Sequence, residues 1–393
     1  MKNTAIVAEY NPFHKGHKYQ IEKIKNNESN VIVIMSSSFT QRGTPAIIDK
    51  FTRALIALEN GADLVIELPC VFSTSNAEIF AKGAIGILNS MDCIDYLCFG
   101  LEDNIKDLVN IKTLIDANKS VSDINIRKYL FMGYSYPVAR ELSYDFLTFE
   151  YKSIIKKPNN ILGLEYLRAL DFYKSQIKPI HIKRKYASHK STRAINNFSS
   201  SSFIRKEIEK NNFLIIKDLV PQNSYNELIS QPKVYLNDFF KIFKYIILKE
   251  DINYTDYIDY EKGIEKRFLE FMDSKDIYEF IKKVSSKRYT YSRITRLIIQ
   301  IVLDLKKDFI LSSLSAPYIR ILGASENGFS ILKVLKEKKI TYIDKFVKIK
   351  SLDDDSIVKK IALKESFATD LYNNILNKPA GEDYLVSSKI KRT

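Results

Sequence analysis

Short β-branched runs alternate with amphipathic helical stretches along the first half of the chain. The strand-like runs lie at 4–10, 31–35, 63–69, 95–99 and 179–183. The helical stretches between them begin near Gly16, Asp49, Ala77 and Leu162. This alternation predicts a parallel sheet with helices on both faces, whose ligand crevice lies at the carboxyl ends of the strands where the strand order reverses. We therefore predict an α/β fold with a doubly wound parallel sheet.

The second half of the chain has a different pattern. After Arg205 the sequence changes to long helical stretches rich in Lys and Tyr, with few strand candidates. At 393 residues the chain is long enough for more than one hydrophobic core. We predict an α/β domain over 1–210, followed by a mostly helical C-terminal domain over 211–393.

The formal charge of +14 is unevenly distributed. Residues 1–100 hold nine of the 61 Lys and Arg and ten of the 47 Asp and Glu, so the positive excess lies entirely downstream. A basic second half favours an RNA partner, although a general Lys-rich composition would produce the same excess. No apolar window is long enough to cross a bilayer, and residues 1–10 do not resemble an export signal. We expect a cytoplasmic protein with no membrane association.

The segment A-E-Y-N-P-F-H-K-G-H follows the first predicted strand and opens a helix. His14 and His17 are three residues apart and so share one side of the first helical turn. Unpaired N–H groups and the positive end of the helix dipole make phosphate the natural ligand there, and Gly16 allows a close approach. The alternatives are two histidines without a ligand and, less favoured, a zinc site, because no third ligand lies nearby.

A run of serines, Ser199–Ser202, precedes Arg205. Hydroxyl and N–H groups at a helix start, with an arginine one turn further on, would form a second anion site. A flexible loop is the alternative interpretation. The three cysteines lack the paired spacing of metal sites, so we predict no metal bound by side chains.

Both motifs resemble those of the nucleotidylyltransferase superfamily, in which H-x-G-H grips the phosphates of ATP. The serine run resembles that superfamily's I-S-S-T-x-I-R element, with Ser199 in place of an apolar residue and Ser202 in place of threonine. Longer segments resemble the bacterial tRNA(Met) cytidine acetate ligase family over nearly the whole chain. They are IVAEYNPFHKGHKYQI, FTQRGTPAIIDKFTRALIALENGADLVIELP, YLCFGLED, KKPNNILGLEYLRAL, SKRYTYSRITRLI and PYIRILG.

This resemblance implies a nucleotidylyltransferase-like catalytic domain and a two-step reaction. Acetate and ATP, with Mg²⁺, would give acetyladenylate and pyrophosphate, and the acetyl group would pass to N4 of the wobble cytidine of elongator tRNA(Met). His14, His17 and Arg205 would be catalytic, stabilising the departing pyrophosphate. The alternatives are an adenylyltransferase acting on another small acceptor and a noncatalytic RNA-binding protein with a nucleotide-binding fold.

The resemblance also assigns an ATP site. From sequence alone, Gly100 is equally well a turn glycine, Asn159 a helix cap and Arg184 a solvated cation. The site comprises Val7, Ala8, Glu9, Tyr10, Asn11, Pro12, Phe13, His14, Lys15, Gly16, His17, Lys18, Tyr19, Gln20, Gly100, Asn159 and Arg184, and Ser202 joins it from the serine run.

Three residues depart from the family pattern. The family reads closer to M-S-G-N-F where this chain has Ser37 and Ser38, and Leu101 replaces a small polar residue after Gly100. We expect these positions to border the acetate pocket, which leaves the identity of the acid open.

A second basic motif interleaves cations with tyrosines. Lys287, Arg288, Arg293 and Arg296 are its cations, which would hold phosphates while the tyrosines stack on bases. We predict an RNA-binding surface here, with a solvated edge of an amphipathic helix as the alternative. Arg320, in P-Y-I-R-I-L-G, is a second candidate.

Overall fold

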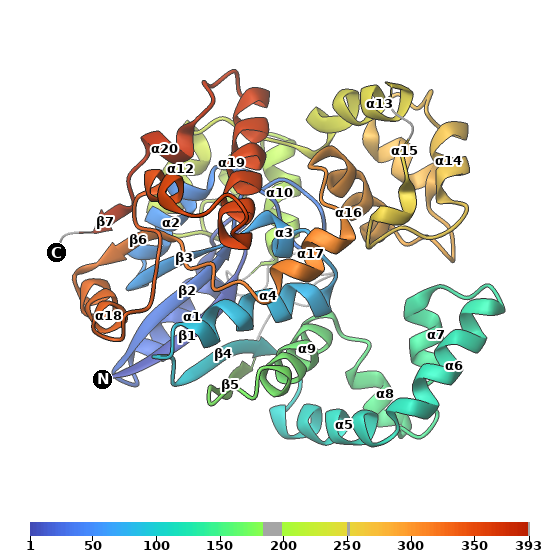
Figure 1. The fold of residues 1–393 in the computed structure, drawn as a ribbon, viewed down its shortest axis with the longest axis horizontal. Coiled ribbons are helices and arrows are strands. Elements are labelled where there is room, and N and C mark those ends of the chain that lie inside the picture. Colours follow the sequence, from blue (N-terminus) through green and yellow to red (C-terminus); the bar gives the residue numbers. More distant parts are fainter. Residues whose placement is uncertain (184–198, 250–251, 392–393) are drawn as a thin grey trace.

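The computed structural model describes residues 1–183, 199–249 and 252–391. A central sheet runs through the body of the molecule (Figure 1). Its strands are β1 (Lys2–Ala8), β2 (Ser29–Ser36), β3 (Leu64–Leu68), β4 (Tyr96–Leu101), β5 (Lys178–Lys183), β6 (Ile321–Ser325) and β7 (Lys389–Lys391). The first five are parallel in the order β5-β4-β1-β2-β3, which confirms the predicted doubly wound parallel sheet.

The strand order reverses at β1, with β2 and β3 on one side and β4 and β5 on the other. Every residue of β2 and β3 is buried, as expected for parallel strands covered on both faces. At such a reversal the loops after the two neighbouring strands diverge and leave a crevice. The ends of β1 and β4, at Ala8 and Leu101, therefore mark where a ligand would bind.

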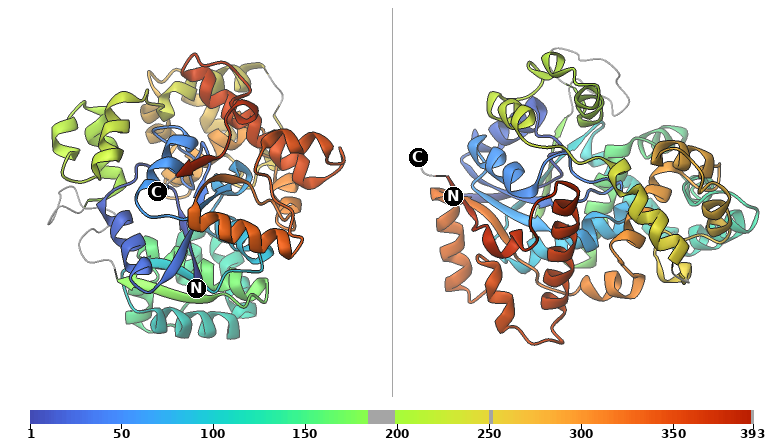
Figure 2. Two further views of the ribbon diagram at one scale, coloured as in Figure 1. Left: turned by 90° about the vertical axis from the view of Figure 1, so that its left-hand side faces the viewer. Right: turned by 90° about the horizontal axis from the view of Figure 1, so that it is seen from above.

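Helices cover both faces of the sheet (Figure 2). They include α1 (Lys15–Lys25) and α2 (Lys50–Glu59) on one face, and α4 (Ala77–Ser90) and α9 (Pro158–Phe172) on the other. Alternate residues of β2 belong to two separate apolar clusters. Val33 packs with Ile21 of α1, whereas Ile32 belongs to the cluster that contains Ile85 of α4. The period-two alternation of a strand thus supplies both layers of the core.

Two groups of helices project from this body on the same side of Figure 1. The first, called the arm, consists of α5 (Ile105–Ala117), α6 (Lys119–Phe131), α7 (Tyr136–Leu142) and α8 (Phe149–Ile154). The second, called the helical lobe, includes α13 (Phe240–Lys249), α14 (Ile264–Glu270), α15 (Ile277–Val284) and α16 (Tyr291–Val302).

The second half of the chain is mostly helical, as predicted, but it also returns to the sheet. β6 pairs antiparallel with β3, and β7 pairs parallel with β6. Two further helices of this half, α19 (Ile357–Ile375) and α20 (Glu382–Leu385), lie against the body that contains the sheet and not in either projecting group (Figure 1). A domain boundary near residue 210 stays a prediction.

A buried ionic network joins this returning segment to the sheet. Lys50 Nζ donates to Glu67 Oε1 (2.7 Å) and lies 2.8 Å from Asp383 Oδ1. Arg320 donates to Glu67 Oε2 (3.1 Å) and to Asp383 Oδ1 (2.8 Å), and only 3% of its surface is exposed. The prediction of Arg320 as an RNA contact was therefore wrong. A cation paired this completely inside the protein cannot reach a phosphate.

Candidate functional site

A cavity of about 810 Å³ lies at the reversal of strand order, within the range of sizes of small-molecule sites. Three walls enclose it. The turn wall comes from the end of β1, the start of α1 and the start of α10 (Ser201–Glu209). The strand wall comes from β4, β5 and α9. The loop wall comes from the loop after β2 together with parts of α4, α7 and α16.

The turn wall begins with the two predicted histidines. His14 is the N-cap of α1, and its ring stacks on that of His17 with centroids 3.6 Å apart. The backbone N–H of His14 donates to His17 Nδ1 (3.2 Å), so the neutral imidazole of His17 carries its proton on Nε2. The first turn of the helix thus combines its N–H groups with an imidazole donor, which suits a phosphate ligand.

Tyr10 supports His17 from the side. Its ring meets the rings of His17 and Phe13 edge-on at 4.9 Å and 4.7 Å. The Tyr10 side chain is 1% exposed, and its hydroxyl has no hydrogen-bond partner among the described residues. Burial raises the pKa of this phenol, so it remains a protonated donor at the cavity wall.

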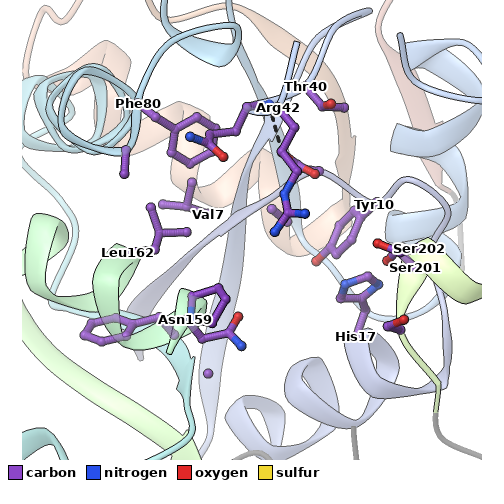
Figure 3. Close-up of a pocket in the computed structure, with 18 of the residues that line it drawn as sticks. Val7, Tyr10, His17, Thr40, Arg42, Phe80, Asn159, Leu162, Ser201 and Ser202 are labelled. Atoms are coloured by element: carbon purple, nitrogen blue, oxygen red, sulfur yellow. Dashed lines mark hydrogen bonds between the residues drawn. The ribbon is translucent and has the colours of Figure 1, made fainter. Parts of the chain in front are cut away.

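The serine run forms the rest of the turn wall. Ser200 caps α10 by accepting the N–H of Phe203 (3.2 Å). Arg205 donates to the backbone oxygen of Asn11 (2.5 Å) and to Ser202 Oγ (3.4 Å). Burial lowers the pKa of Arg205. Glu9 opposes this effect and Arg42 adds to it. The predicted second anion site therefore faces the same space as His17 (Figure 3).

The strand wall is mainly apolar. Gly100 of β4 and Leu162 of α9 both belong to its lining. Lys157 is the N-cap of α9, so Asn159 does not cap that helix. Asn159 Nδ2 instead donates to Glu102 Oε1 (2.6 Å), and the residue lines the cavity. A flat apolar surface beside one amide suits a nucleobase and its ribose.

Sequence reasoning did not predict the loop wall, and it assigned Arg296, one of its members, to RNA binding. The loop wall contains Thr40, Gln41, Arg42, Thr44, Asn76, Ala77, Phe80, Tyr136, Ser292 and Arg296. One signal could have located its first four members. They follow β2, whose carboxyl end lies at the same edge of the sheet as those of β1 and β4.

Most of the predicted ATP-site residues meet at this cavity. Those that line it are Val7, Ala8, Glu9, Tyr10, His14, Gly16, His17, Tyr19, Gln20, Gly100, Asn159, Ser202 and Arg205. Five others are absent from its lining: Asn11, Pro12, Phe13, Lys15 and Lys18. Asn11 braces the turn by accepting the N–H of Ile47 (2.9 Å). Arg184 lies outside the described residues.

The three departures from the family pattern lie away from the cavity, contrary to our expectation. Ser37 and Ser38 are 0% and 1% exposed, and neither lines the cavity. The backbone oxygen of Ser37 accepts from Arg53. Leu101 is fully buried and lies against Gly163, where an added Cβ would meet its side chain at 2.7 Å. These substitutions therefore affect packing rather than the cavity wall.

The predicted RNA-binding cations are mostly paired. Arg288 and Arg293 both donate to the carboxylate of Glu261. Arg296 makes a two-pronged contact with Asp259 at 2.8 Å and 2.6 Å. Lys287 is exposed. The motif thus holds α16 to the loop before α14, which sequence reasoning did not foresee.

Neither a metal cluster nor a membrane span is present in the described part of the chain. No group of three or more His, Cys, Asp or Glu residues there could hold a metal ion. No helix there is long and apolar enough to cross a membrane. Among the described residues that line the cavity, Glu9 is the one with a carboxylate side chain.

The parallel sheet, with the H-x-G-H turn and the serine run lining one cavity where its strand order reverses, is typical of the nucleotidyl transferase class. The chain matches the HIGH Nucleotidyl Transferase family model over residues 1–385 and belongs to that family. It is 36% identical over 387 residues to the tRNA(Met) cytidine acetate ligase of Clostridium novyi, covering 95% of this chain and 96% of that one. The enzyme of the same name from Caldanaerobacter subterraneus is 36% identical over 386 residues, covering 95% of each chain.

Two solved structures extend the likeness to the whole fold. The apo structure of Thermotoga maritima TmcAL has a TM-score of 0.92 and 30% identity, and each chain is covered completely. The same enzyme bound with alpha-thio ATP has a TM-score of 0.91 and 29% identity, again with complete coverage. This chain therefore belongs to the tRNA(Met) cytidine acetate ligase family.

Proposed function

We propose that this protein is an ATP-dependent ligase that acetylates N4 of the wobble cytidine of elongator tRNA(Met). The observation that carries the proposal is the cavity where the strand order reverses, which His17, Ser202 and Arg205 line together. Family membership supports the choice of substrates, because the relatives are named for tRNA(Met), cytidine and acetate. A solved relative bound with alpha-thio ATP supports the nucleotide.

The first step is the formation of acetyladenylate. An acetate oxygen attacks the α-phosphorus of ATP, the bridging bond to the β-phosphorus breaks, and its electron pair leaves with pyrophosphate. Acetate is already ionised at neutral pH, so this step needs no general base. His14, His17 and Arg205 stabilise the charge that grows on pyrophosphate, together with the N–H groups at the start of α1.

The strand wall would hold the adenosine. Its apolar residues Ile161 and Leu162 offer a face for adenine, and Asn159 offers a polar contact. We include Arg184 in this site as part of the same proposal. Mg²⁺ would enter with the phosphates of ATP and offset their negative charge, and Glu9 is the lining carboxylate that could help to hold it.

The second step is acetyl transfer to RNA. The N4 amino group attacks the carbonyl carbon of acetyladenylate, AMP leaves, and the nitrogen loses one proton. An unpaired anticodon base can be turned out of its stack to reach an enclosed cavity. A cytoplasmic location, where tRNA is found, stays part of the proposal.

The RNA would approach along the helical lobe. Ser292 and Arg296 of α16 belong to the cavity lining, so this helix joins the lobe to the reaction site. Lys287, just before α16, is exposed and available for a phosphate. Arg288 and Arg293 share Glu261, so we assign them a smaller role in holding RNA.

Incubation with ATP, Mg²⁺ and labelled acetate, with and without elongator tRNA(Met), tests this function. The expected result is labelled N4-acetylcytidine at the wobble position in the digested RNA. Its formation should require ATP and should need no acetyl-CoA. Binding of ATP without any acetylcytidine would contradict the proposal and would favour an adenylyltransferase with another acceptor.

A further inference from the structure

The loop wall carries a cation to which the sequence motifs assign no role. Arg42 belongs to the loop between β2 and α2, and its exposed side chain lines the cavity. In Figure 3 its guanidinium enters the cavity between Val7 and Tyr10, whereas Ser201 and Ser202 lie on the other side of Tyr10. The two sides of this ring thus carry different polar groups.

The Arg42 loop is fixed at both of its sides. The N–H of Gln41 donates to Glu9 Oε1 (2.9 Å), which ties the loop to the end of β1. On the other side, Gly43 has a φ of +73°, and an added Cβ would lie 2.6 Å from the Cα of Arg296. The loop is therefore held between the turn wall and α16. Contacts of the two neighbouring residues, Gln41 and Gly43, fix the backbone position from which the Arg42 side chain enters the cavity.

In-line displacement separates the two ends of the reaction. The attacking and leaving oxygens lie on opposite sides of the phosphorus. If pyrophosphate leaves toward the serine run, the attacking acetate enters from the opposite side. Figure 3 draws the Arg42 guanidinium on the other side of Tyr10 from Ser201 and Ser202.

We propose, on the basis of the function proposed above, that Arg42 is a further catalytic residue that binds the carboxylate of acetate. The planar fork of an arginine matches a carboxylate with two parallel hydrogen bonds. Held in this way, one acetate oxygen attacks the α-phosphorus while the positive charge offsets repulsion between the two anions. Phe80 and Val7, which also line the cavity, provide an apolar surface for the methyl group.

Acetate-dependent exchange of pyrophosphate into ATP, measured without tRNA, tests this role. Arg42→Ala should raise the KM for acetate about 10- to 100-fold, the loss typical of a charge-assisted hydrogen-bonded contact. Its Kd for ATP should stay within about twofold, because the phosphates are held by the turn wall. The KM for acetate of Arg42→Lys should lie between those of the unmodified protein and Arg42→Ala, because lysine keeps the charge but loses the paired hydrogen bonds of the guanidinium. Arg127→Ala, which alters an exposed arginine of α6 outside the lining, is the matched control.

Two outcomes would overturn the role of Arg42. An unchanged KM for acetate with a raised KM for tRNA would make Arg42 an RNA contact. A raised Kd for ATP equal to the change in acetate KM would make it part of the nucleotide site. If the unmodified protein shows no acetate-dependent exchange at all, the proposed function itself fails, and the two failures are thus distinguished.

Substitution of Gly43 tests the positioning separately. Gly43→Ala adds a Cβ that meets the backbone of α16, so it should shift the loop and raise the KM for acetate without removing the guanidinium. Gly133→Ala is the matched control, because Gly133 also has a positive φ (+88°) but nothing lies within 4 Å of its added Cβ. An equal KM for acetate in both variants would refute the positioning role of the loop contact.

Discussion

Arg320 and Arg205 occupy two kinds of site in one molecule. Arg320 is paired with Glu67 and Asp383, which outweigh the effect of burial and raise its pKa. Arg205 is held by a carbonyl and a hydroxyl, and burial lowers its pKa. The first cation is neutralised by the protein and stabilises the fold. The second donates to no carboxylate among the described residues, so an anionic substrate can accept its hydrogen bonds and neutralise its charge.

Removal of a cation from the buried network should have the largest effect on stability. Arg320→Ala leaves Glu67 and Asp383 without one of their partners, so the free energy of unfolding should fall by about 3–5 kcal/mol. Chemical denaturation measures the change, and Arg127→Ala serves as the exposed control. A loss below about 1 kcal/mol would contradict a stabilising role, since surface substitutions already reach about 0.5 kcal/mol.

Removal of a donor from the turn wall should affect catalysis instead. His17→Ala should lower the rate of acetate-dependent pyrophosphate exchange about 10²- to 10³-fold, as expected for a donor to developing charge. The matched control is His181→Ala, which alters a histidine of β5 outside the cavity lining. Equal losses in the two variants, or a loss explained by unfolding in a thermal melt, would argue against the assignment.

The pH dependence of stability should report on the network. Burial, together with Glu67, raises the pKa of Glu365 to about 7 from its ordinary value of 4.5. A raised folded-state pKa means that the folded protein holds more protons between these values. Stability should therefore fall by about 1–3 kcal/mol as pH rises from about 4.5 to about 7. Urea unfolding across this window measures the slope, and Glu365→Gln should flatten it. A slope that persists in Glu365→Gln would assign it to another group.

The smallest effect should come from the helical lobe. Lys287→Ala should weaken the binding of all tRNA sequences alike. The slope of log affinity against log salt concentration should decrease by about one phosphate contact. Arg293→Ala should change stability more than it changes tRNA affinity, because Arg293 is held by Glu261 and the backbone oxygen of Asp259. Filter binding at several salt concentrations measures the affinities, and chemical denaturation measures the stabilities. A larger loss of tRNA affinity in Arg293→Ala than in Lys287→Ala would show that pairing with a carboxylate does not decide which cation contacts RNA.

Much of the fold and of the turn wall could be predicted from the sequence. The turn after β1, Gly100 at the end of β4 and Asn159 at the start of α9 belong to local motifs at the ends of regular elements, so periodicity and resemblance locate them. The loop wall could not be found in this way, because Arg42 and Phe80 belong to separate segments that meet only after the sheet has formed.

The role of charge was the least predictable property. Arg293, Arg296 and Arg320 are as basic in sequence as Arg205, but their carboxylate partners are distant in the chain. Asp259 lies 37 positions from Arg296, and Asp383 lies 63 positions from Arg320. Pairing of this kind is fixed by tertiary packing, so a basic pattern alone does not separate a structural cation from one that binds substrate.

The most direct test of the account follows the oxygen atoms of acetate. Acetate labelled with ¹⁸O in both carboxylate oxygens would be used with ATP and elongator tRNA(Met), and the released AMP and pyrophosphate would be analysed by mass spectrometry. Attack on the α-phosphorus predicts one ¹⁸O atom in each AMP and none in pyrophosphate, because the attacking oxygen stays with AMP when the acetyl group leaves. Label in pyrophosphate, or AMP without label while acetylcytidine forms, would contradict the acetyladenylate mechanism.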